Sequence, residues 1–240
     1  MSFYQIHESA RPLPEKLRPI FDIWLSSQTM MSKVVRWKAW HEIQGTRRQD
    51  DVQHSYSLVV LALNFIDKLH LYLYLKNDPL LIIRAVTYHE IGEGERGRDV
   101  LLANKTDAKD LEEYEAFVAR FRNLSGFNRC HDAFLLQFVP KRPANFPPEA
   151  QTIMARLANE NRYDVYAFQA LENLDYLFYA IEQRVTINNR DCLAGVFLYA
   201  RPILDSLAQK LPGLREEYWT PEFIAYCEEM AEGGNTAVPK

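Results

Sequence analysis

Four residues with metal-binding side chains lie on or beside apolar helical stripes of this sequence. His54 opens one stripe, His89 closes another, and Asp175 interrupts a third. An ionised carboxylate on an apolar face costs much free energy unless it is protonated, paired with a cation or bound to a metal. Glu90 follows His89 directly and adds a fourth donor. Because mixed nitrogen and oxygen donors suit a divalent transition metal, we predict one ion bound by His54, His89, Glu90 and Asp175.

Each of these residues also has a purely structural interpretation. A single histidine on an apolar face is more often a core histidine that bonds a carbonyl group than a metal ligand. Asp175 could be a buried acid paired with Arg36 or Arg84. Adjacent helical residues diverge by about 100°, so His89 and Glu90 reach one ion only near the edge of a stripe. From spacing alone, both interpretations stay open.

The composition limits the classes of protein to which this chain can belong. The 240 residues include 28 basic and 32 acidic ones, and the resulting net charge of -4 argues against a protein that mainly binds the nucleic-acid backbone. Three cysteines without a CxxC pair argue against a disulfide framework and favour a reducing cytoplasm. There is no signal-like start and no apolar run near the roughly 20 residues of a membrane span. We therefore expect a cytoplasmic protein without membrane or nucleic-acid partners.

Helical periodicity runs through most of the chain, and convincing strand alternation is absent from the pattern. A count of only 9 glycines also favours helices over a turn-rich sheet fold. We predict an all-α, single-domain helical bundle over residues 1–240, with a motif-bearing core at about 30–185 and C-terminal helices at 186–232. The predicted helices cover residues 14–31, 52–75, 79–92, 108–124, 151–157, 161–183, 191–211 and 220–230.

The connecting segments follow from the same pattern. Residues 44–51 and 94–107 are predicted loops, and residues 126–150 a mixed stretch with one short helix. On the helix predicted over residues 108–124, Glu112, Glu113 and Glu115 are expected to form a solvated face.

The order of the four predicted metal ligands resembles a known family. His54, the pair His89-Glu90 and the distant Asp175 are similar to the H…HD…D signature of the HD-domain phosphohydrolase superfamily, with Glu90 where that family has aspartate. The gap of 35 residues between the two histidines suits the family. The resemblance implies a helical bundle of the HD-domain type and one bound divalent metal, Mn, Co, Ni, Fe or Zn.

Further residues resemble the bacterial HD-domain 5′-deoxynucleotidases in particular. That subgroup has an Arg-Trp pair before the first histidine, here Arg36-Trp37, and a glutamate one helical turn after the second, here Glu93. A Gly-Asp pair followed by lysine is similar to Gly97-Arg-Asp99 and Lys105. The resemblance implies a metal-dependent phosphomonoesterase that releases phosphate from (deoxy)nucleoside 5′-monophosphates.

The resemblance also assigns expected roles. Glu93 would orient or deprotonate the attacking water, and Asp99 would position that water or protonate the leaving oxygen. Arg36 and Lys105 would bind phosphate oxygens, and Trp37 would pack against the sugar. The resemblance further implies a homodimer, for which the C-terminal helix with Trp219, Phe223 and Tyr226 is a candidate surface.

Three other functions remain open from the sequence. The substrate could be another phosphoester, a nucleoside triphosphate or a cyclic dinucleotide, for which Arg47, Arg48, Arg96 and Arg98 offer basic side chains. Glu90 could mark a nucleotide sensor that does not catalyse, although a pure binder needs no water-activating Glu93. An HD-type diiron oxygenase needs more histidines before the last aspartate, where only His131 occurs.

Overall fold

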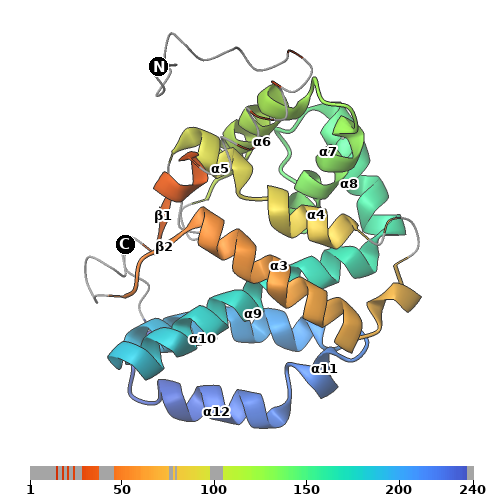
Figure 1. The fold of residues 1–240 in the computed structure, drawn as a ribbon. Helices are drawn as coiled ribbons and strands as arrows, with labels where there is room; N and C mark the ends of the chain where they lie inside the picture. The colour runs from red at the N-terminus through yellow and green to blue at the C-terminus, as the bar shows by residue number, and fades with distance from the viewer. Residues whose placement is uncertain are drawn as a thin grey trace.

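The computed structural model describes residues 29–37, 46–75, 78, 80–97 and 105–236, together with Glu15, Arg18, Phe21 and Trp24. These residues form an all-α bundle, as predicted, with one pair of two-residue strands. One helix, α3 (Asp51–Lys68), crosses the middle of the molecule (Figure 1). Helices α4 (Leu81–Tyr88) and α5 (Ile91–Arg96) lie on one side of it. The other side is occupied by α9 (Arg162–Ile187), α10 (Arg190–Leu207) and α12 (Pro221–Ala231). The helix predicted over residues 14–31 lies mostly outside the described residues.

Helix α3 begins with a reciprocal cap and ends earlier than predicted. The Asp50 carboxylate accepts a bond from the Gln53 amide nitrogen, and the Gln53 side chain accepts one from the Asp50 amide. The chain leaves the helix after Lys68 because His70 adopts a left-handed conformation with φ of 49°, and the short 3-10 helix Leu71–Leu73 follows. The predicted continuation to residue 75 is therefore wrong.

The helix predicted over residues 79–92 is in fact two helices. Helix α4 (Leu81–Tyr88) and helix α5 (Ile91–Arg96) are separated by a bend at His89 and Glu90, and Gly97 ends α5 with φ of 70°. Both residues keep right-handed helical torsion angles, with ψ of -34° at His89 and φ of -86° at Glu90. Their side chains nevertheless reach one point, because Nε2 of His89 lies 3.1 Å from Oε1 of Glu90.

Helix α6 (Asp107–Phe121) packs tightly on α5 through a glycine. A Cβ added to Gly92 would lie 2.6 Å from the carbonyl oxygen of Glu113, so only glycine allows this approach. Asp110 and Glu113 are each only 1% exposed as a result. The expectation that Glu113 faces solvent is wrong, because α5 covers that side of α6.

The other elements complete the bundle. The segment predicted as mixed contains α7 (Phe127–Leu135) and a 3-10 turn (Leu136–Phe138), and α8 spans Pro148–Glu160, longer than predicted. Helix α9 (Arg162–Ile187) lies beside α10 (Arg190–Leu207), and the four-residue α11 (Leu214–Glu217) and α12 (Pro221–Ala231) follow (Figure 1).

A short antiparallel strand pair was not predicted: its second strand lies in the predicted loop 44–51, and its first in a segment without a predicted element. Strand β1 (Val35–Arg36) pairs with β2 (Gln49–Asp50), with Arg36 opposite Gln49. Two residues per strand are too few to show alternation in a sequence. The pairing brings Arg36 and Trp37 to the start of α3.

One continuous hydrophobic core joins helices from α3 to α12 among the described residues. Trp219 is fully buried in it, contacts Phe197 and Phe223, and donates from Nε1 to Asp205 at 2.7 Å. Its expected place on a dimer surface is therefore wrong, although Tyr226 remains exposed. Within the described ranges, no helix combines the length and the apolar character that a membrane span requires.

Candidate metal centre

The imidazoles of His54 and His89 face each other at the centre of the molecule. Their Nε2 atoms are 3.3 Å apart, and the two residues are 0% and 5% exposed. Each Nδ1 has an acceptor: Asp175 Oδ2 at 2.8 Å from His54, and the Val86 carbonyl at 3.1 Å from His89. Because Nδ1 donates in both rings, the neutral tautomers aim both Nε2 lone pairs at the same space.

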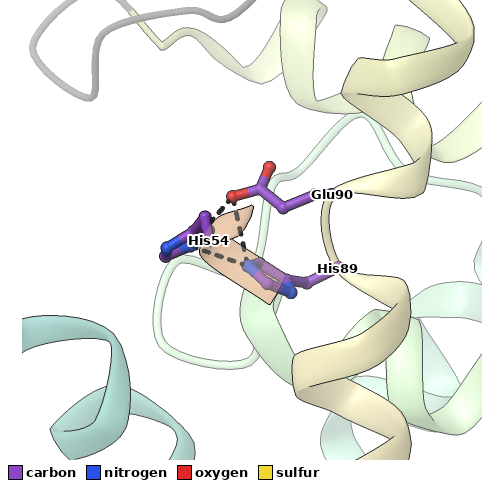
Figure 2. Close-up of side chains that lie close together, drawn as sticks. All are labelled: His54, His89 and Glu90. Atoms are coloured by element: carbon purple, nitrogen blue, oxygen red, sulfur yellow. Dashed lines mark hydrogen bonds and ion pairs between the residues drawn. The ribbon is translucent and has the colours of Figure 1, made fainter. Parts of the chain in front are cut away.

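Glu90 completes a three-residue cluster with these imidazoles. Its Oε1 atom lies 3.2 Å from Nε2 of His54 and 3.1 Å from Nε2 of His89. Figure 2 shows the carboxylate of Glu90 and the ring of His89 leaving the same bend of the chain toward His54. All three side chains are buried, and their donor atoms lie close enough together to hold one ion.

A fourth donor comes from Glu172 on α9, which the sequence analysis did not single out. Its Oε1 atom is 3.0 Å from Nε2 of His89 and 3.7 Å from Nε2 of His54, and its Oε2 atom accepts a bond from the Tyr176 hydroxyl at 2.8 Å. Glutamates on helices are usually solvated, so the residue type alone did not indicate a metal ligand. Its position four residues after the apolar Phe168 could have given one, because that spacing puts both on the stripe that continues to Asp175.

Asp175 is not brought to the point where these donors converge. It contacts Nδ1 of His54, on the far side of the ring from Nε2, and its other oxygen accepts a bond from the Ser57 hydroxyl at 2.6 Å. This contact fixes the tautomer of His54 and raises the basicity of Nε2, which is how carboxylates behind metal-bound histidines act. The structure thus gives Asp175 a supporting place rather than the ligand place predicted for it.

The spacing of the four donor atoms suits a small divalent cation. Donors at about 2.0–2.2 Å from an ion are separated from their neighbours by about 3.0–3.6 Å in octahedral or tetrahedral geometry. The separations of the two histidine Nε2 atoms from each other and from the Oε1 atoms of Glu90 and Glu172 range from 3.0 to 3.7 Å. Two imidazoles and two carboxylates are also a donor set that zinc, iron, manganese, cobalt and nickel accept.

The charges of the cluster are strongly coupled. Burial lowers the pKa of His89, but the carboxylates of Glu172 and Glu90 raise it to about 9. Burial and Arg36 lower the pKa of His54, yet Asp175 and Glu172 raise it well above its ordinary value. Burial raises the pKa of Glu90, but Arg36 and the two histidines hold it well below the ordinary value. Burial also raises the pKa of Glu172, and the two histidines hold it well below the ordinary value. Ionised carboxylates therefore surround the imidazoles, a field that favours a cation between them.

Arg36 and Trp37 reach the edge of this cluster through the β1–β2 pair. The Arg36 guanidinium forms an ion pair with Glu90 and lies 3.6 Å from Asp51. The Trp37 ring stacks on Tyr179 with centroids 4.6 Å apart and donates from Nε1 to Gln49 at 2.9 Å. Trp37 has φ of 59°, a strained conformation for a bulky residue and a feature that functional sites often show.

Glu93 and Lys105 form a second layer on the α5–α6 side. Glu93 is 2% exposed, and its carboxylate, with those of Asp51 and Glu90, forms a second compact group of donors. Lys105 Nζ lies 2.5 Å from Glu93 and 3.3 Å from Glu113, and these acids raise the pKa of Lys105 against the lowering effect of burial. In this structure the charge of Lys105, predicted to bind phosphate, is thus directed at two carboxylates.

The remaining predicted residues lie elsewhere. Asp99 and Arg98 lie outside the described residues. Arg47 pairs with Glu182, Arg96 pairs with Glu112, and His131 is buried against Tyr114 and Phe127. Two of the four arginines invoked for larger phosphoesters, Arg47 and Arg96, are therefore paired with acids, and Arg48 is exposed.

Three comparisons with known proteins gave no match. Neither a family model, nor a curated protein, nor a solved structure matches it. The resemblance to HD-domain phosphohydrolases therefore rests on the motif residues alone, and the function has to be argued from the arrangement of these side chains.

Proposed function

We propose that this protein is a metal-dependent phosphohydrolase that releases phosphate from (deoxy)nucleoside 5′-monophosphates. The observation that carries the proposal is the convergence of both Nε2 atoms with Glu90 and Glu172 beside the buried carboxylate of Glu93. His54, His89, Glu90 and Glu172 would hold the ion, and Asp175 would orient His54. When bound, such an ion supplies Lewis acidity toward a phosphoryl oxygen and lowers the pKa of water.

The charged residues around the ligands have separate tasks in this proposal. Glu93 accepts the proton of the attacking water, and Lys105 fixes the position of its carboxylate. Arg36 neutralises Glu90 and Asp51 and places a guanidinium at the edge of the site, where it can donate to a phosphate oxygen. Asp99 keeps its predicted role near the leaving oxygen.

The aromatic residues next to His54 support a nucleoside substrate. Tyr176 stacks on the His54 ring, with centroids 5.9 Å apart, and meets Trp37 edge to face at 5.7 Å. Trp37 and Tyr176 thus form a stiff wall on the Arg36 side of the cluster. A flat apolar wall beside a phosphate-binding arginine suits a sugar or base attached to that phosphate.

The test is phosphate release by metal-stripped protein after Mn²⁺, Co²⁺, Ni²⁺, Zn²⁺ or Mg²⁺ is added back. The substrates are ribo- and deoxyribonucleoside mono- and triphosphates and a cyclic dinucleotide. Release from the monophosphates supports the proposal. Release only from triphosphates or cyclic dinucleotides would show that the substrate is one of these phosphoesters rather than a monophosphate. Nucleotide binding without phosphate release under any metal would indicate a sensor.

A pair of variants on α5 tests the role of Glu93. Glu93→Gln keeps the shape and removes the base, so the turnover rate should fall about 10²- to 10⁴-fold while metal content stays normal. Glu95→Gln is the matched control, because Glu95 lies on the same helix but pairs with Arg120 away from the cluster. Full activity in Glu93→Gln would exclude Glu93 as the base.

A further inference from the structure

A cavity lies at the other end of α9 from the β1–β2 pair, between α9 and the last turns of α10. It measures about 660 Å³ and is lined by residues of α8, α9 and α10 and of the segment after the 3-10 turn Leu136–Phe138. Its position separates it from the metal cluster, since none of the proposed metal ligands lines it. The volume falls in the range of small-molecule sites.

The charged side chains that line this cavity are all basic. Arg142, Arg162 and Lys210 line it, and no aspartate or glutamate does. Lys210 Nζ contacts Ser206 Oγ at 3.0 Å, and Arg162 lies over the ring of Tyr163; among the described residues, none of the three cations forms an ion pair. By contrast, Arg156 on the neighbouring α8 pairs with Asp132 at 2.7 Å. Three unneutralised cations around one concavity attract an anion.

The backbone conformation of Arg142 also supports an anion-binding cavity. Arg142 has φ of 46°, in the left-handed region, which is strained for a residue with a Cβ. Its amide donates to the Phe138 carbonyl at 2.8 Å, where a glycine would hold the same turn without strain. The arginine at this position therefore adds a guanidinium to the cavity at a cost in stability.

The floor of the cavity is apolar. Val139, Val165 and Leu207 are buried in it, and the ring of Tyr166 lies 5.7 Å from Lys210 Nζ. Gln169 and Ser206 add polar groups. A basic rim over an apolar and aromatic floor suits a ligand with a ring at one end and phosphates at the other.

From this combination we infer a second binding site in which Arg142, Arg162 and Lys210 bind the phosphates of a nucleoside diphosphate, with its ring on Tyr166 and the aliphatic floor. The site stands apart from the proposed hydrolysis. It shares helix α9 with Glu172, but none of the proposed metal ligands lines it.

The test is titration of the full-length protein with a fluorescent N-methylanthraniloyl ADP in EDTA, which keeps metal out of the cluster. We expect saturable binding that ADP and inorganic pyrophosphate displace and that adenosine does not. Arg142→Gly, which also relieves the strained backbone, and Lys210→Ala should each raise the dissociation constant about tenfold, as loss of a charge-assisted bond to phosphate would.

Two controls locate the bound probe. Arg129→Ala removes an exposed arginine outside the cavity and should leave the dissociation constant unchanged. His89→Ala should also leave it unchanged, because the metal cluster is not involved. Absence of saturable binding, failure of pyrophosphate to compete, or binding that depends on His89 but not on Arg142 and Lys210 would overturn the second site without affecting the proposed hydrolysis.

Discussion

At the scale of single residues, Glu172 and Asp175 differ in the imidazole nitrogen that each carboxylate contacts. Both are acidic side chains on one face of α9, but Glu172 faces Nε2 of His89 and Asp175 holds Nδ1 of His54. We expect Asp175→Asn, which leaves an acceptor for Nδ1–H, to weaken metal affinity about 10- to 100-fold. Glu172→Gln should weaken it further, because a donor atom is lost. Metal titration of both variants checks this order, and the reverse order would return Asp175 to the ligand set.

The raised pKa of His89 predicts a pH dependence for the metal-free protein. When the pKa of a group is higher in the folded than in the unfolded state, the group stabilises the fold at low pH. The stabilisation is complete below the unfolded-state pKa and is lost as the pH rises above the folded-state pKa. For His89 the difference between a pKa of 6.5 and one of about 9 corresponds to about 3 kcal/mol. This contribution should be present below pH 6.5 and lost as the pH rises through 9. Urea unfolding in EDTA at both ends of this window measures the change in stability. His89→Gln should reduce that change, and the part due to His54, whose pKa is also raised, should remain. An equally large change in that variant would exclude His89 as its source.

At the scale of elements, the contact between α5 and α6 positions Glu93 through Gly92. Ala is a better helix former than Gly by about 1 kcal/mol, so propensity alone would make Gly92→Ala stabilising. The added Cβ would meet the Glu113 carbonyl oxygen at 2.6 Å, and we expect a net loss of about 1–3 kcal/mol of unfolding free energy instead. Urea unfolding decides the sign. Unchanged or increased stability would show that α5 and α6 do not need this approach.

At the scale of the whole molecule, the four proposed ligands tie three parts of the bundle together. They come from α3, from the bend between α4 and α5, and from α9, which Figure 1 shows meeting around the centre of the fold. An ion that binds only the folded state stabilises it by about 4 kcal/mol at 1,000 times its dissociation constant. Excess Mn²⁺ or Zn²⁺ should therefore raise the melting temperature of metal-stripped protein, and His54→Ala should lose this rise. A rise that survives in His54→Ala would place the ion elsewhere.

The sequence by itself determined the helical class and singled out His54 and His89 as candidate metal ligands. Apolar periodicity, and a polar residue that interrupts it, can both be recognised from local spacing. Only the tertiary structure decided which carboxylate oxygens lie beside the two imidazoles. The bend at His89 and Glu90, the burial of Glu113 and the contact of Glu172 with His89 all depend on how helices pack. An acid on a helix faces either water or a partner, and that choice is made by the element that covers it, which no local pattern contains.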